Sequence, residues 1–182
     1  MIGILKDCVI LLKQRGIILI NVVLFEPEIP QNTGNIMRTC VAIGARLHLI
    51  KPFGFALSQT KRAAVNYTDS LDYLVYDDFL DFKVNNKGIY LFYTRYATKD
   101  YCQFLFDETE NYYLIFGKES TGIDKEILKN NLENCFRIPT TDKVRSLNLA
   151  NSVAIVAYEA MRQLSFSGLI GYDIHKGIDF LN

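Results

Sequence analysis

Apolar, β-branched runs alternate with helical patterns along most of the chain. Helices are predicted at Thr33–Ile43, near Tyr76–Phe82, at Asp124–Leu132 and from Asn148 to about Leu164. Between them, polar, Gly or Pro residues bound a set of apolar runs, which predicts strands at Ile17–Phe25, Leu47–Ile50, Ile89–Thr94, Tyr112–Phe116 and Cys135–Ile138. This alternation indicates an α/β fold with a mostly parallel sheet and helices on both faces. In such folds ligand sites gather beyond the carboxyl ends of the strands.

A single domain over residues 19–166 accounts for most of the 182-residue chain. Residues 1–18 are interpreted as an extension before the first core strand, and residues 167–182 as a C-terminal tail. Charged and polar residues at 13–15 interrupt the apolar N-terminus, so no apolar run of about 18 residues is available for a membrane span. The charged cluster also follows the first apolar run, unlike the order in a signal peptide. We therefore expect a cytoplasmic protein.

The last predicted helix is apolar around its whole circumference between Val153 and Tyr158. A helix of this kind is buried on more than one side, and in a domain of this size the second side can be covered by another subunit. The pattern therefore favours a homodimer formed through the C-terminal helix.

Charges are balanced in total but segregated along the chain. Lys plus Arg and Asp plus Glu both number 20, so the net charge indicates no polyanionic partner. The stretch from Ile29 to Thr68 nevertheless lacks Asp and Glu, and its basic residues are Arg38, Arg46, Lys51, Lys61 and Arg62. Two interpretations stay open: a basic surface for a polyanion, or solvated surfaces that happen to carry one sign.

Several common catalytic and metal-binding motifs are absent from the sequence. It contains no G-x-G-x-x-G, G-x-x-x-x-G-K-[ST], G-x-S-x-G or H-E-x-x-H pattern, which excludes most hydrolases and nucleotide-dependent enzymes. The four cysteines are scattered without a C-x-x-C pair, so no metal site or disulfide framework is predicted. The two histidines, His48 and His175, are expected at the surface or at a strand end.

The first segment with candidate chemistry, Glu26–Arg38, follows a predicted strand and opens a helix. Asn32 is a candidate helix cap. Asn35 and Arg38 are three residues apart and share a helix face opposite the apolar stripe. Arg38 is therefore either a ligand-contacting residue at the functional edge of the sheet or a solvated surface arginine.

Two further segments have the same strand–loop–helix arrangement. In Leu114–Ile123 the glycines permit either close approach of the backbone to a ligand or an ordinary turn between a strand and a helix. The segment is not a phosphate loop, because Glu119 stands where that motif needs Ser or Thr. In Arg137–Ala154 a polar loop precedes the apolar helix, and Ser146 is its candidate cap. That helix opens with polar residues at one-turn spacing, which need partners when buried, and a ligand is one option.

In this order and spacing, the three segments resemble the motifs of the SPOUT class of RNA methyltransferases, which use S-adenosylmethionine. The patterns P-Q-N-T-G-N-I-x-R, F-G-x-E-x-x-G and I-P-x-x-x-x-x-R-S-L-N-L-A-N-S-V-A carry the resemblance, which covers about Asn21 to Leu164. They are most similar to the minimal single-domain branch that methylates the ribose 2′-oxygen of the tRNA wobble nucleotide, cytidine or modified uridine 34. The resemblance implies a C-terminal trefoil knot, which no periodicity argument would propose.

The resemblance also implies roles for individual residues. It implies a cofactor pocket of Thr94, Gly117, Ile138 and Ser146, and it places catalytic or site-shaping residues at Arg38, Asn32, Glu119 and Asn148. An unperturbed arginine stays protonated, so we favour a role for Arg38 in clamping the target phosphate and stabilising the developing alkoxide, rather than direct action as a base. Removal of the proton would then be assisted by the target phosphate. The RNA backbone would contact the basic residues Arg46, Lys51, Lys61 and Arg62.

Two alternatives to a tRNA methyltransferase follow from the same residues. The first keeps the fold and cofactor but acts on ribosomal RNA, since no appended RNA-binding domain decides between the substrates. The second is a non-catalytic RNA-binding module of the same fold, against which the presence of Arg38, Glu119 and Asn148 argues.

Overall fold

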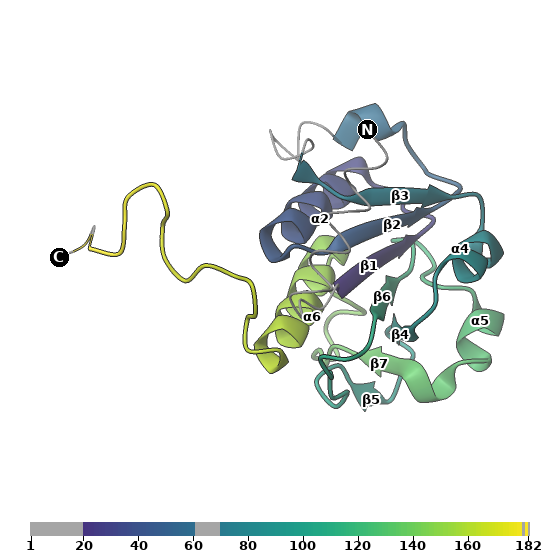
Figure 1. The fold of residues 1–182 in the computed structure, drawn as a ribbon. Helices are drawn as coiled ribbons and strands as arrows, with labels where there is room; N and C mark the ends of the chain where they lie inside the picture. Colours follow the sequence, from purple (N-terminus) through teal and green to yellow (C-terminus); the bar gives the residue numbers. More distant parts are fainter. Residues whose placement is uncertain (1–19, 61–69, 180, 182) are drawn as a thin grey trace.

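The computed structural model describes residues 20–60, 70–179 and 181, and in this part of the chain the strands form one seven-stranded sheet (Figure 1). The strands are β1 (Ile20–Phe25), β2 (Arg46–Ile50), β3 (Tyr73–Tyr76), β4 (Ile89–Tyr93), β5 (Lys99–Asp100), β6 (Tyr112–Phe116) and β7 (Cys135–Arg137). Every neighbouring pair is parallel, in the order β3-β2-β1-β6-β4-β7-β5. The predicted α/β class with a parallel sheet is confirmed.

Helices cover both faces of this sheet (Figure 1). They are α2 (Pro30–Ile43), α4 (Phe79–Asn85), α5 (Lys125–Lys129) and α6 (Leu149–Gln163), with short 3-10 turns at Leu57–Thr60 and Leu132–Asn134. Alternate residues of β1 point to opposite faces. Val22 and Leu24 join the core cluster of α2 and α6, whereas Val23 and Phe25 join that of α4 and α5. The core is therefore two apolar layers separated by the sheet.

The strand order does not follow the chain order. Strand β6 lies between β1 and β4, and β7 lies between β4 and β5, so each enters between two strands that precede it in the sequence. The carboxyl ends of β6, β4 and β7 are consequently neighbours. The trefoil knot implied by the resemblance stays a prediction.

Two strands were not predicted, and one helix begins later than predicted. Strand β3 is a short edge strand whose Tyr73, Leu74 and Val75 are exposed, and β5 is only two residues long. The helix predicted near Tyr76–Phe82 is misplaced, because Tyr76 ends β3 and α4 starts after Asp78. The carboxylate of Asp78 accepts a hydrogen bond from the backbone N–H of Asp81 at 2.8 Å, which sets this start.

Both predicted helix caps are wrong. Helix α2 begins at Pro30, so Asn32 lies within its first turn and its side chain makes no cap hydrogen bond. Helix α6 is capped by Asn148 rather than Ser146, since the Asn148 Oδ1 accepts from the backbone N–H groups of Ala150 and Asn151 at 2.9 and 3.3 Å. The predicted end of α2 is correct, because Gly44 adopts a left-handed conformation with φ of 68°.

Helix α6 is buried on one side and partly exposed on the other. Val153 and Val156 are fully covered by the sheet and α2, whereas Ile155 and Tyr158 are 36% and 44% exposed. Among the described residues, no helix combines the length and apolar character that a membrane span requires. The predicted extension, residues 1–18, lies outside the described residues, and from Ser165 onward most of the described chain is exposed (Figure 1).

His48 is fully buried in the middle of β2, which contradicts the predicted position at the surface or at a strand end; His175 is exposed as predicted. The His48 Nδ1 lies 2.8 Å from the Tyr76 hydroxyl and its Nε2 lies 3.0 Å from the Asn21 Oδ1. The Asn21 amide nitrogen is committed to the Tyr112 carbonyl oxygen, so Nε2 donates to Oδ1. Burial, aided by the charge of Arg46, lowers the pKa of His48 to about 3, so the buried imidazole is neutral.

This buried imidazole should make folding sensitive to mild acid. Between the folded pKa of about 3 and the unfolded value of about 6.5, only the unfolded chain is protonated, so stability falls as pH decreases below about 6.5. From pH 7 to pH 5, we expect wild type to lose about 2 kcal/mol more unfolding free energy than His48→Gln in urea titrations. The His175→Gln variant, which changes an exposed histidine, should lose as much unfolding free energy between pH 7 and pH 5 as wild type does. Equal losses for wild type and His48→Gln would contradict this assignment.

Candidate functional site

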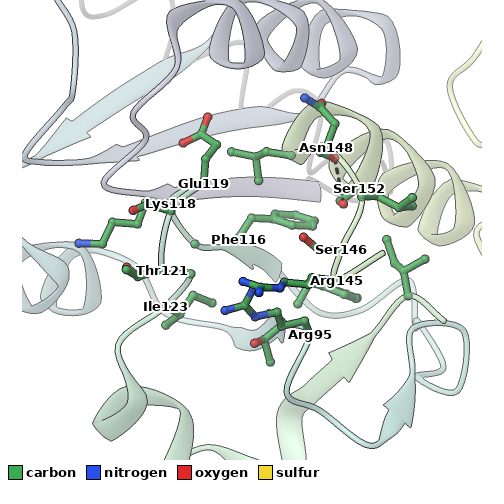
Figure 2. Close-up of a pocket in the computed structure, with 18 of the residues that line it drawn as sticks. Arg95, Phe116, Lys118, Glu119, Thr121, Ile123, Arg145, Ser146, Asn148 and Ser152 are labelled. Atoms are coloured by element: carbon green, nitrogen blue, oxygen red, sulfur yellow. Dashed lines mark hydrogen bonds between the residues drawn. The ribbon is translucent and has the colours of Figure 1, made fainter. Parts of the chain in front are cut away.

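A cavity of about 290 Å³ lies beyond the carboxyl ends of β4, β6 and β7 (Figure 2). The loops that follow these three strands form its walls, and the first turns of α2 and α6 close it. Its apolar walls are Ile29, Phe116, Ile123, Ile138, Leu147 and Leu149. Apolar walls with a few placed polar groups are typical of small-molecule sites, and the volume lies at the lower end of the usual range of about 300–1,000 Å³.

The structure brings the predicted catalytic and cofactor residues together at this cavity, with one exception. The lining includes Asn32, Thr94, Gly117, Glu119, Ile138, Ser146 and Asn148. Arg38 is exposed on α2 and does not belong to the lining. The three motifs therefore form one site, and Arg38 lies outside it on the same chain.

A chain of hydrogen bonds joins the three motifs across the cavity. The Asn148 Nδ2 donates to the Asn32 Oδ1 at 2.9 Å, and the Asn32 Nδ2 donates to the Glu119 Oε1 at 2.9 Å. The other carboxylate oxygen, Oε2, accepts from the backbone N–H of Glu28 at 2.9 Å. Residues from α6, α2 and the loop after β6 are thereby held in one arrangement.

The direction of this chain follows from the helix that starts it. Because the first N–H groups of α6 need an acceptor, Asn148 must present its Oδ1 to them and its Nδ2 to Asn32. Asn32 must then accept with Oδ1 and donate with Nδ2, which requires the acceptor that the Glu119 carboxylate provides. Each polar side chain in the sequence Asn148, Asn32, Glu119 is satisfied in only one orientation.

The loop after β6 is also tied to the loop after β1. The Ser120 hydroxyl and backbone N–H donate to the Glu28 carboxylate at 2.7 and 2.8 Å, and the Ser120 hydroxyl is the main cause that lowers the pKa of Glu28. Lys118 forms an ion pair with Glu26, and this hydrogen bond raises the pKa of Lys118. Both acidic residues therefore hold the site loop instead of facing the cavity as free carboxylates.

Gly117 is required by close backbone approach within the same loop. A Cβ atom there would lie 2.2 Å from the carbonyl carbon of Gly122 and 2.3 Å from the nitrogen of Ile123. The loop folds back on itself at this point, with the Gly122 N–H donating to the Lys118 carbonyl oxygen at 2.9 Å. Any side chain at Gly117 would force this wall of the cavity open.

Sequence reasoning missed several polar residues of the lining. Arg95 and Tyr96 belong to the loop that follows β4, and Arg137 and Arg145 belong to the third motif. Their place after predicted strands could have identified them as site residues, since residues beyond the carboxyl end of a parallel strand face the functional edge of the sheet. Tyr93 also lines the cavity, and its buried hydroxyl has no hydrogen-bond partner among the described residues. An unsatisfied buried hydroxyl costs free energy, which suits a wall that a ligand completes.

Two of the predicted RNA-binding residues, Arg46 and Lys51, belong to the described chain, and neither lines the cavity. Arg46 is the first residue of β2, so it lies at the amino end of that strand, away from the carboxyl ends where the cavity lies. Its Nη2 is 2.6 Å from the Asp72 Oδ2. Lys51 follows β2 and pairs with Asp77 at 2.8 Å. Lys61 and Arg62 lie outside the described residues. Within the described chain, the basic run thus pairs with the acidic run that follows it in the sequence.

A family model supplies the observation that decides the family. The model for the SpoU rRNA Methylase family matches residues 19–158. The chain belongs to the SpoU rRNA Methylase family. The resemblance to SPOUT-class RNA methyltransferases is thereby confirmed.

Named relatives of this SpoU family member include RNA methyltransferases. A Listeria innocua protein named tRNA (cytidine(34)-2′-O)-methyltransferase is 46% identical over 158 residues, covering 82% of this chain and 91% of the relative. A structure described as giving insights into the 2-OH methylation of C/U34 on tRNA has a TM-score of 0.76 and 39% identity, covering 81% and 97% of the two chains. An AdoMet-bound rRNA methyltransferase from Sinorhizobium meliloti has a TM-score of 0.71 and 27% identity, covering 80% of this chain and 57% of that one.

Removing the central amide of the hydrogen-bond chain should destabilise this SpoU family member. Asn32→Ala leaves the Asn148 Nδ2 without its acceptor and removes one donor from Glu119, and we expect a loss of about 1–3 kcal/mol in the free energy of unfolding. Urea titration measures the loss. Asn35→Ala is the matched control, since Asn35 is exposed on the same helix, and it should stay within about 0.5 kcal/mol of wild type. An equal effect of the two substitutions would show that the chain adds nothing to stability.

Proposed function

We propose that this protein transfers a methyl group from S-adenosylmethionine to the ribose 2′-hydroxyl of nucleotide 34 of tRNA, cytidine or modified uridine. The observation that carries the proposal is the convergence of three motifs, far apart in the sequence, on one cavity. The names of the relatives at 46% and 39% identity support the same substrate position. As a tRNA-modifying enzyme, it is expected to act in the cytoplasm.

The residues of the cavity fit the proposed cofactor. S-adenosylmethionine presents a flat apolar base, ribose hydroxyls and a charged amino-acid end. Ile138 and Leu147 offer apolar surface for the base, while Thr94, Gly117 and Ser146 offer hydroxyl and backbone groups. When bound, the cofactor supplies an electrophilic methyl group on a positively charged sulfur.

The chain's own residues would orient the acceptor and manage its proton. The 2′-oxygen would form the new C–O bond as the methyl–sulfur bond breaks, and the hydroxyl proton would leave toward the adjacent phosphate. A permanently charged Arg38 suits this step, because it stabilises both the phosphate and the developing negative charge on oxygen. Asn32, Glu119 and Asn148 would shape the site around the acceptor.

A homodimer formed through α6 belongs to the same proposal. The exposed face of α6 carries Ile155 and Tyr158, and α6 packs beside α2, which carries Arg38. Burying that face against a second copy would remove the exposed apolar side chains from water. Because Arg38 does not line the cavity of its own chain, we infer that it acts at the cavity of the second copy.

The proposed reaction is tested by incubating purified protein and labelled S-adenosylmethionine with tRNA and, separately, with ribosomal RNA. Unmodified and native tRNA are both needed, because a prior modification can be a requirement. We expect label at the ribose of nucleotide 34, mapped by nuclease digestion and mass spectrometry. Label confined to ribosomal RNA would identify ribosomal RNA, rather than tRNA, as the substrate. Absence of binding heat in calorimetry when S-adenosylmethionine is added would favour a non-catalytic RNA-binding module.

Complementation between inactive variants tests both Arg38 and the dimer. We expect Arg38→Ala to lower kcat about 100-fold or more, within the range for loss of one stabilising group in a transition state. Gly117→Val should be inactive through loss of cofactor binding. Mixed after subunit exchange, the two variants should regain up to about a quarter of wild-type activity, because in each mixed dimer the intact cavity of the Arg38→Ala chain receives Arg38 from the Gly117→Val chain. Absence of any recovery, with mixed dimers verified by mass, would place Arg38 at its own chain's cavity.

A further inference from the structure

The cavity carries more positive charge than its cofactor explains. Among the lining residues, Arg95, Lys118, Arg137 and Arg145 are cationic, and Glu119 is the acidic one. Lys118 is paired with Glu26, but within the described chain no carboxylate lies within salt-bridge distance of the three arginines. The Glu119 carboxylate is occupied by the backbone N–H of Glu28 and by Asn32.

Arg95 and Arg145 come from two different loops to line the same cavity. Arg95 follows β4 and Arg145 precedes α6, and both side chains extend to the same part of the view in Figure 2. Two like charges held at one place without an intervening carboxylate repel each other, so they favour a bound anion between them. Guanidinium groups suit phosphate in particular, because their fixed N–H donors match its oxygens in pairs.

Tyr96 holds Arg95 in this position. The Arg95 Nη2 donates to the Tyr96 hydroxyl at 2.7 Å, and the guanidinium carbon lies 4.9 Å from the centre of the tyrosine ring. This hydrogen bond is the main cause that lowers the pKa of Tyr96, and the charge of Arg145 adds to it. The two arginines thus act on one hydroxyl, which places their charges in the same region. A stacked and hydrogen-bonded arginine loses less side-chain freedom on binding.

Binding of the cofactor alone would not compensate the positive charges of the lining. S-adenosylmethionine has one carboxylate, one ammonium and one sulfonium, so it brings a net positive charge into a lining that is already cationic. An anionic co-substrate offsets both. The RNA of the proposed reaction supplies one phosphate on each side of every ribose.

We propose that Arg95 and Arg145 together bind a backbone phosphate of the substrate RNA beside the methylated ribose, with Tyr96 positioning Arg95. This assignment rests on the proposed function and adds RNA-binding residues to it. It differs from the role proposed for Arg38, which lies outside the cavity of its own chain. The pair would fix the register of the RNA strand and read no base.

The test separates RNA binding from cofactor binding in the full-length protein. Arg95→Gln, Arg145→Gln and the double variant are compared with wild type for tRNA affinity, by fluorescence anisotropy of a labelled tRNA transcript at several salt concentrations, and for S-adenosylmethionine affinity, by calorimetry. Each single variant should weaken tRNA binding about tenfold and reduce the salt slope by about one. The affinity for S-adenosylmethionine should stay within about twofold of wild type, because the cofactor brings its own net positive charge.

Two further variants serve as a control and as a positioning readout. Lys129→Gln removes one charge from the exposed, ion-paired surface of α5, and it should leave tRNA affinity unchanged. Tyr96→Phe removes the hydroxyl that orients Arg95, so it should weaken tRNA binding by about threefold while retaining the charge. Thermal melts of all variants confirm that they fold.

Two results would overturn the phosphate assignment. If the arginine variants weaken S-adenosylmethionine binding about tenfold and leave tRNA binding unchanged, the pair binds the cofactor carboxylate instead. If neither affinity changes, the pair binds no ligand. Failure of the proposed function has a different signature, because wild type would then transfer no methyl group to tRNA while the anisotropy comparison still reports on the arginines.

Discussion

The N–H groups that open α6 must be given an acceptor, and this requirement propagates through the whole site. It turns the Asn148 amide so that its nitrogen faces Asn32, which in turn must donate to the carboxylate of Glu119. Three motifs separated by many residues are therefore held by side chains that have one satisfied arrangement. The cavity between them exists in its observed shape because no member of this chain can rotate without leaving a polar group unpaired.

The strand order supplies the positions that these side chains join. Because β6 enters between β1 and β4, and β7 between β4 and β5, loops that begin at residues 94, 117 and 138 start from adjacent strand ends. In a sheet wound in chain order, the same loops would start from strands farther apart. The hydrogen-bond chain and the strand order are thus two parts of one arrangement: topology brings the loops together and the amides fix their distance.

The sequence predicted the elements with strong periodicity and missed what depends on neighbours. Strand β6 has its predicted bounds because Tyr112–Phe116 is buried on both faces, whereas exposed edge strand β3 gave no comparable signal. His48 was misplaced because its partners, Asn21 and Tyr76, come from the two adjacent strands, a proximity that only the sheet creates. The lining residues carried by the motifs were predictable from the resemblance, but the missed arginines follow from the position of strand ends.

The distribution of charge explains how a chain without net charge can present a cationic site. The basic run of the sequence pairs with the acidic run after it, because β2 and β3 are adjacent and parallel, so Arg46 meets Asp72 and Lys51 meets Asp77. Because each of these cations is paired with a carboxylate, the pairs contribute little to the electrostatic potential at the edge of the cavity. Glu26 and Glu28 are drawn into the loop contacts around it, and the arginines of the lining keep their charge uncompensated by carboxylates of the described chain. Local pairing, rather than total charge, therefore decides which surface attracts an anion.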